Sequence, residues 1–150
     1  MTAALQRPLV CRGIRGATTV EANTAEDILE ATGDLLRVLI ALNDLQSDDI
    51  ASAIFTTTPD LTATFPALAR GGLDWDVVPL LCGHEMAVPG ALERVVRVLL
   101  HVNTTRSAAE VRHVYLNGAR DLRPAWAIPD DELAAILGRP VPVTTGDGSS

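Results

Sequence analysis

The chain has 150 residues, of which 47% are hydrophobic, so its length indicates one domain and its composition excludes wholesale disorder. Its formal net charge of −7 argues against nucleic acid as the main partner, although a local cluster of basic groups could still bind a small anion. Two cysteines favour a reduced, cytoplasmic protein, no apolar run is long enough to span a membrane, and the N-terminus lacks a signal-peptide pattern.

The first part of the chain predicts an arm, a strand, a helix and a second strand. Residues 1–8 are expected to form a flexible arm, and Leu9–Val20 alternates as a strand with Ile14 on one face and Arg15 on the other. Thr24 fits a helix N-cap, and the apolar spacing after it predicts a helix over 25–42. The β-branched stretch Ile50–Thr58 predicts the second strand.

The remainder predicts shorter elements. Pro66 suits the first turn of a short helix that ends near Arg70, before Gly71-Gly72. Short strands are expected over 77–82 and 113–116, with a long apolar strand over 95–103. Residues 107–110 have capping-box spacing for one helical turn. A short helix is expected over 129–137, followed by a disordered tail over 138–150.

This order of elements indicates one α+β or α/β domain, in which helices pack on a mixed β-sheet. Few helices are available, so they cannot cover both faces of such a sheet. We therefore expect exposed apolar surface and an oligomer.

Motif spacing excludes several kinds of site. The three histidines lack metal-ligand spacing with one another or with the cysteines, so no metal is expected. Gly13-Ile-Arg-Gly16 is a GxxG stretch, but this acidic chain offers no aromatic surface near it for stacking bases. The sequence also lacks a Gly-rich phosphate loop and a nucleophile elbow.

Arginines inside apolar segments are the main candidates for chemistry. All twelve basic residues are arginine, which reflects either codon bias or a need for bidentate carboxylate recognition. Arg97 lies in an apolar run that should be buried, so its guanidinium needs either a core carboxylate or a bound anion. Arg15 lies between Gly13 and Gly16, which let other backbone or a ligand come close, unless Arg15 is simply an exposed arginine at the sheet edge.

Four other residues are ambiguous when each is taken alone. Arg123 precedes Pro124 and is expected to be extended, as a loop charge would be. Tyr115 fits a packing residue, Glu85 a solvated loop residue and Cys82 a small buried hydrophobe.

Four segments, taken in order along the chain, favour a functional over a purely structural interpretation of these residues. They are Arg12–Val20, Thr58–Leu61 with Phe65-Pro66, Cys82–Met86, and Arg112–Leu116 leading to Leu122–Pro124. Together they resemble the small trimeric α/β chorismate mutases, the AroH class, over most of residues 9–126. The resemblance implies a [3,3] rearrangement of chorismate to prephenate, on the way to phenylalanine and tyrosine. It also implies no metal or organic cofactor, and a pseudo-α/β-barrel homotrimer with a site at each subunit interface.

The resemblance carries over to particular residues. Arg97 matches the arginine at the breaking ether oxygen, and Glu85 matches the glutamate that accepts a hydrogen bond from the substrate hydroxyl, with Cys82 beside it. Arg15 matches an arginine that holds a carboxylate. Further substrate-binding matches are Tyr115, Arg123 and Leu122, and the wall residues Phe65 and Ala67 from a neighbouring subunit.

The chain also departs from the family pattern. Leu68 replaces the lysine that the family usually has at the pocket mouth. The segment between Phe65 and Trp75 is one residue shorter than is common in the family. Arg70 is expected to stand in for the family's helix arginine, but because of this shortening the resemblance does not fix the direction of its side chain. Residues 127–150 lie outside the resemblance and are expected to form a partly disordered extension. The alternatives are a non-catalytic carboxylate-binding or regulatory trimer of the same fold, favoured by Leu68, and another small trimeric enzyme such as an imine or enamine hydrolase.

Overall fold

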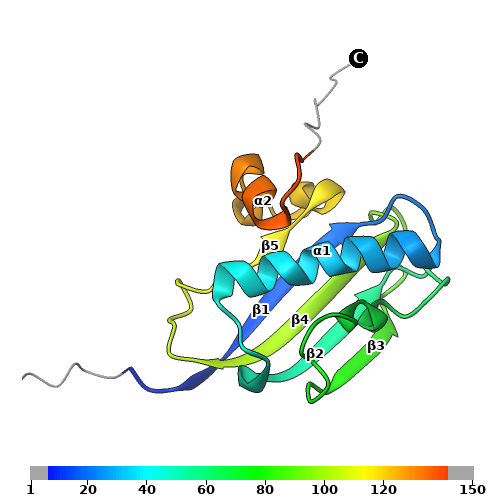
Figure 1. Cartoon of the computed structure of the whole chain (residues 1–150). Coiled ribbons are helices and arrows are strands. Elements are labelled where there is room, and N and C mark those ends of the chain that lie inside the picture. The colour runs from blue at the N-terminus through cyan, green and yellow to red at the C-terminus, as the bar shows by residue number, and fades with distance from the viewer. Residues whose placement is uncertain (1–6, 142–150) are drawn as a thin grey trace, which may run out of the picture.

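A mixed sheet of five strands forms the centre of the fold, with the strand order β3-β2-β4-β1-β5 (Figure 1). The computed structural model describes residues 7–141. β1 and β2 both run antiparallel to β4, whereas the outer strands β5 and β3 run parallel to β1 and β2. The strands are β1 (Val10–Thr19), β2 (Ile50–Thr57), β3 (Leu80–His84), β4 (Val95–Thr104) and β5 (Val114–Tyr115). The predicted mixed sheet with helices is confirmed.

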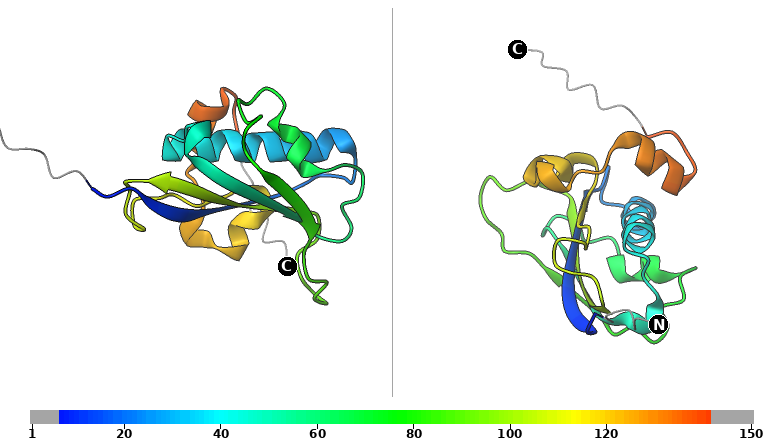
Figure 2. Two further views of the ribbon diagram at one scale, coloured as in Figure 1. Left: turned by 90° about the horizontal axis from the view of Figure 1, so that it is seen from below. Right: turned by 90° about the vertical axis from the view of Figure 1, so that its left-hand side faces the viewer.

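Within residues 7–141, two α-helices and four short 3-10 helices accompany the sheet. They are α1 (Ala25–Asn43), α2 (Asp130–Leu137), η1 (Ser47–Asp49), η2 (Pro66–Arg70), η3 (Asn117–Leu122) and η4 (Pro124–Trp126). Figure 2 shows α1 and η2 on one face of the sheet and the segment containing η3 and η4 on the other. No helix within residues 7–141 is both long and apolar enough to cross a membrane.

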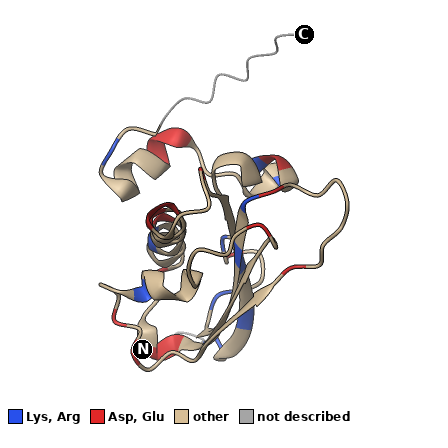
Figure 3. Cartoon of the chain, turned by 90° about the vertical axis from the view of Figure 1, so that its right-hand side faces the viewer, with Lys and Arg blue, Asp and Glu red and all other residues tan. Residues whose placement is uncertain are grey.

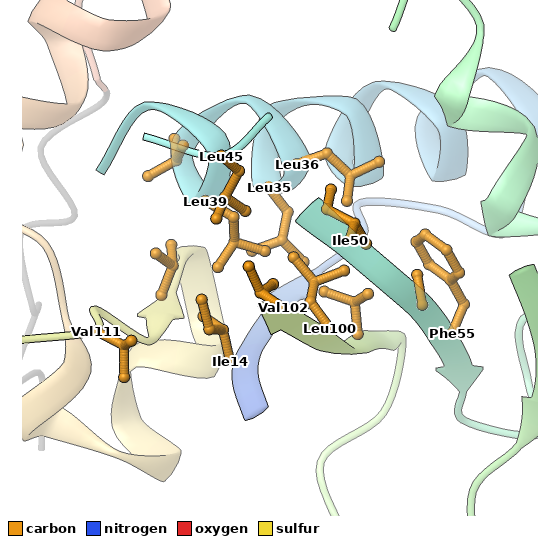
Figure 4. Close-up of a cluster of buried hydrophobic side chains, with 14 of the residues drawn as sticks. Ile14, Leu35, Leu36, Leu39, Leu45, Ile50, Phe55, Leu100, Val102 and Val111 are labelled. Carbon is orange, nitrogen blue, oxygen red and sulfur yellow. The ribbon is translucent and has the colours of Figure 1, made fainter. Parts of the chain in front are cut away.

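Helix α1 forms the main core with the sheet face it covers. The Thr24 hydroxyl accepts a hydrogen bond from the Asp27 amide at 3.1 Å and caps the helix as predicted. Leucines of α1 interdigitate with residues from three strands (Figure 4). Burying each such leucine, isoleucine or phenylalanine contributes about 1.5–3 kcal/mol. The fully buried contacts include Leu35, Leu36 and Leu39 against Ile14, Phe55 and Leu100.

Gly16 on β1 has no side chain, and this allows α1 to pack closely on the sheet. A Cβ atom at position 16 would lie 2.8 Å from Leu39 Cδ1 and 3.0 Å from Leu35 Cδ1. The expectation that glycines around Arg15 make room for a ligand is therefore wrong at this position, because the space is taken by α1. At Gly13 the nearest atom to such a Cβ is Leu99 Cδ1, at 3.6 Å.

The opposite face of the sheet is less covered. β4 alternates regularly, so Val96, Val98 and Leu100 are buried while Arg97 and Leu99 are half-buried. The expectation that Arg97 lies in a fully buried run is thus wrong, because its side chain points to the face without α1 and is 35% exposed.

Other boundaries differ locally from prediction. Asp76–Val78 turns back, with the Val78 amide bonded to the Trp75 carbonyl at 3.1 Å, so β3 covers residues 80–84 rather than 77–82. At residues 107–110 the Glu110 carboxylate accepts from the Ser107 amide at 3.0 Å, as in a capping box, but the chain makes only a turn. The 3-10 helices η3 and η4 were not predicted.

The extension beyond residue 126 packs back onto the domain. Helix α2 lies where a helix was predicted, and Ile128 and Leu133 are buried in the main core. Arg112 makes two hydrogen bonds to Glu132, at 2.5 and 3.2 Å, and Arg139 pairs with Asp34. Residues 1–6 of the predicted arm and 142–150 of the predicted tail lie outside the described residues.

Candidate active site

One row of side chains crosses the open face of the sheet, opposite α1. The strand registers pair Thr56 with Arg97, Arg97 with Ala17, and Ala17 with Tyr115. Residues paired directly across strands project to the same face, about 5 Å apart from one strand to the next. The small side chain of Ala17 therefore separates Arg97 from Tyr115, two strands away. This row places two of the predicted site residues on one face of the sheet, Arg97 half-buried and Tyr115 buried.

Glu85 lies next to Arg97, as the predicted roles require. Its Oε1 atom accepts a hydrogen bond from the Thr56 hydroxyl at 2.6 Å, and its amide donates to the Thr57 carbonyl at 2.8 Å. The distance from Glu85 Oε1 to Arg97 Nη1 is 3.6 Å, which is too long for a strong hydrogen bond. The buried Nε atom of Arg97 has no hydrogen-bond partner within residues 7–141. Much of the donor capacity of Arg97 therefore remains for a ligand.

A second group of site residues gathers at the β1–β5 edge. The guanidinium carbon of Arg15 lies 6.0 Å from the centre of the Tyr115 ring and 5.9 Å from that of Trp126. The guanidinium carbon of Arg123 lies 3.9 Å from the centre of the same Trp126 ring. Within the described chain, neither Arg15 nor Arg123 forms an ion pair. Two positive charges thus share one small area that offers them no carboxylate.

The pKa of His113 is affected by these two arginines. Its Nδ1 atom accepts a hydrogen bond from the Arg15 amide at 2.9 Å, which implies the tautomer with hydrogen on Nε2. Burial, followed by the charges of Arg15 and Arg123, lowers the pKa of His113 below its ordinary value. The neutral ring is therefore favoured, and the positive potential comes from the arginines rather than from the histidine. Although the whole chain is acidic, acidic residues gather in places such as the first turns of α1 and α2, whereas three arginines, Arg12, Arg15 and Arg97, lie on β1 and β4 (Figure 3).

Other predicted residues are not brought to Arg97 within one chain. Phe65, Ala67 and Arg70 belong to the segment around η2, which packs on the α1 side of the sheet (Figure 2). Cys82 also packs against the core on that side, opposite the face that carries Arg97. Leu122 ends η3 and is 38% exposed beside Arg123.

Sequence reasoning missed Thr56, His113 and Trp126. Strand alternation could have found Thr56, which projects to the same face as Arg97. His113 lies inside a predicted segment, Arg112–Leu116, but its contact with Arg15 depends on the β1–β5 pairing. Trp126 lies in a 3-10 turn, where no periodic pattern gives a signal.

Comparisons with known proteins identify the family that this chain resembles. Residues 11–126 match a family model described as chorismate mutase type I. A protein from Thermus thermophilus named chorismate mutase AroH is 50% identical over 114 residues, which cover 75% of this chain and 93% of that protein. Its namesake from Bacillus subtilis (strain 168) is 44% identical over 117 residues, covering 77% of this chain and 92% of that protein. A solved structure titled as a chorismate mutase from Clostridium thermocellum has a TM-score of 0.72 and 48% identity, and covers 73% of this chain and 98% of its own.

Proposed function

Because the chain belongs to the chorismate mutase type I family, we propose that it is an isomerase that converts chorismate to prephenate on the open face of its sheet. The reaction is a [3,3] rearrangement, in which the ether C–O bond breaks while a C–C bond forms. No proton, electron pair or group enters from outside. The division into a catalytic domain over 9–126 and an extension over 127–150 belongs to the same proposal, as does a cytoplasmic location in which Cys11 and Cys82 stay reduced.

The observation that carries the proposal is the set of arginines with unused donors. Arg97 has a buried Nε atom without a partner, and Arg15 and Arg123 have no ion pair within residues 7–141. Chorismate bears two carboxylates and an ether oxygen that gains negative charge as its bond to carbon breaks. Guanidinium groups recognise carboxylates through paired N–H bonds, and a fixed donor at the breaking bond stabilises the transition state.

The positions of these residues suggest a different role for each of them in binding chorismate. Arg97 is assigned to the ether oxygen, and the Thr56 hydroxyl orients Glu85 to accept a hydrogen bond from the substrate hydroxyl. Arg15, with Tyr115 beside it, and Arg123 with Leu122 are assigned to the substrate's carboxylates and pocket wall. Holding the flexible enolpyruvyl group over the ring supplies the rest of the rate enhancement.

We propose in addition that the site is completed by a neighbouring copy in a homotrimer. Phe65 and Leu68 are 68% and 55% exposed near η2, and Leu81 of edge strand β3 is 66% exposed. Large apolar side chains in such positions favour burial against another chain. Since Phe65, Ala67 and Arg70 lie far from Arg97 within one chain, a second subunit would have to bring them to the site. The resemblance assigns Cys82 a place beside Glu85, although within one chain it packs on the α1 side of the sheet.

Activity is tested by following chorismate absorbance with the purified full-length chain and identifying the product. Rapid loss of chorismate with prephenate as the product supports the proposal. A folded protein that leaves chorismate unchanged beyond the uncatalysed rate contradicts it, and would favour a non-catalytic binding role.

The shared site is tested by mixing two impaired variants, Arg97→Ala and Phe65→Asp, under conditions in which subunits exchange. Mixed trimers contain some sites with both wild-type residues, so activity should return. No return of activity, in mixtures shown by native mass spectrometry to have exchanged, would place the whole site within one chain. Sedimentation of the wild type as a monomer would contradict the trimer itself.

A further inference from the structure

Trp126 lies where three candidate site residues meet. Besides Arg123 at 3.9 Å and Arg15 at 5.9 Å, the Tyr115 ring meets the indole edge-on, with centroids 5.4 Å apart. The His113 ring lies on it with centroids 4.1 Å apart. Neither composition nor strand pattern assigns a role to Trp126, but these contacts indicate that it affects the positions of the site residues around it.

The indole is held firmly enough to act as a platform. The Trp126 amide donates to the Arg123 carbonyl at 2.9 Å, and the next residue, Ala127, pairs with Tyr115 in an isolated β-bridge. Ile128 is buried, and its carbonyl accepts a hydrogen bond from Arg120 Nη2 at 2.8 Å. The chain is therefore anchored on both sides of Trp126 and the ring packs against the small cluster that contains Tyr115.

Arg123, by contrast, depends on this ring for its position. It is exposed and forms neither a side-chain hydrogen bond nor an ion pair within residues 7–141. An arginine in that state would sample many rotamers in solution. The guanidinium carbon of Arg123 lies 3.9 Å from the centre of the Trp126 ring, and such a cation–π contact restricts the side chain without using an N–H donor in a hydrogen bond. All the in-plane N–H donors stay available for a carboxylate.

We infer that Trp126 is a positioning residue of the candidate site, which holds the Arg123 guanidinium against the indole that Arg15 also approaches, so that a substrate carboxylate meets two preorganised cations. The inference rests on the proposed function, since it takes the ligand to be the dianion chorismate or prephenate. It adds a residue to which neither the resemblance nor strand patterning assigns a part.

The test compares Trp126→Leu, which removes the aromatic face, with Trp126→Phe, which keeps one. Carboxylate binding precedes the chemical step, so the loss should appear in KM rather than in kcat. Losing the contact in Trp126→Leu should raise KM for chorismate and Kd for prephenate by about tenfold, and Trp126→Phe should restore most of the affinity. Unchanged KM and Kd in a folded Trp126→Leu protein of wild-type oligomeric state would overturn the inference.

A merely structural role is separated by combining the change with Arg123→Ala. If Trp126 acts through Arg123, adding Trp126→Leu to Arg123→Ala should raise KM little further, whereas additive effects would contradict the inference. If Trp126→Leu fails to fold, Trp126 fluorescence in a Trp75→Phe background replaces it. There Arg123→Ala should change the emission, and prephenate should change it only when Arg123 is present; no change in either case overturns the inference.

The same experiments separate this inference from the proposed function. A wild type that neither turns over chorismate nor binds prephenate overturns both. A wild type that turns over chorismate, alongside a Trp126→Leu variant with unchanged KM, overturns only the role of Trp126.

Discussion

Replacing Gly16 with alanine should destabilise the protein, because Gly16 lies against the core side chains of α1. It also directly follows Arg15 of the candidate site, so a shift of this part of β1 would move that residue. The added Cβ would lie 2.8 Å from Leu39 Cδ1, 3.0 Å from Leu35 Cδ1 and 3.2 Å from Val98 Cγ1. Real Cβ atoms almost never come as close as the first contact, so the Leu39 and Leu35 side chains, or the elements that carry them, must shift. Both leucines are fully buried, which leaves them little free space to move into.

The magnitude follows from two opposing effects. Overpacking a core typically costs about 1–3 kcal/mol. Replacing glycine with alanine recovers about 0.4–1 kcal/mol by reducing the entropy of the unfolded chain. Taking the middle of each range, the net loss is about 1.3 kcal/mol, which for a chain of this size lowers Tm by about 3–5 °C.

The assay is thermal unfolding at matched protein concentration, since assembly would couple stability to concentration. The matched control is Gly33→Ala within α1, where an added Cβ meets nothing within 4 Å. That variant should be more stable than wild type by up to about 1 kcal/mol, because alanine favours the helix. A Gly16→Ala protein as stable as wild type would refute the packing argument. Because β1 also carries Arg15, any shift of the strand should appear as a higher KM.

The remaining predictions concern the site. Thr56→Val should lower kcat/KM about tenfold, because Glu85 loses a charge-assisted hydrogen bond while the side-chain shape is kept; wild-type activity would remove Thr56 from the account. The pKa of His113 is lowered in the free protein by burial and by two arginine charges, so a bound dianion should raise it. Prephenate should consequently bind more tightly as pH falls between the free and bound pKa values, and NMR titration of the His113 ring would show no upward shift if the arginines do not meet the ligand. Leu68→Lys should lower KM with little change in kcat, and an unchanged KM would count against a role for position 68 in substrate capture.

The parts of the fold that could be predicted have strong periodic patterns. β1, α1, β2 and β4 follow from alternation or helical spacing, and their boundaries match the structure within one or two residues. The error at Arg97 arose because the apolar run was treated as buried on both faces. Its neighbours Val96 and Val98 point toward α1, which leaves residue 97 on the open side.

Apart from Thr56, which strand alternation could have placed on the face of Arg97, the site was predictable only where the family resemblance named residues. The resemblance identified Arg97 and Glu85, and the structure brings them within 3.6 Å. It could not identify Trp126, because the ring meets Arg123 through a turn without regular hydrogen-bonded periodicity. Nor can one chain show what Phe65 faces, since that residue lies on the other side of the sheet.

The central claim is that a fixed Arg97 guanidinium on the open face drives the rearrangement of chorismate. The most direct test is the rate of chorismate loss for the wild type and Arg97→Ala, measured side by side on proteins with the same fold and assembly. Removing one preorganised donor costs about 3–4 kcal/mol in other enzymes, so the account predicts rapid formation of prephenate by the wild type and a loss of at least about 100-fold in the variant. An Arg97→Ala protein within tenfold of wild type would contradict the claim.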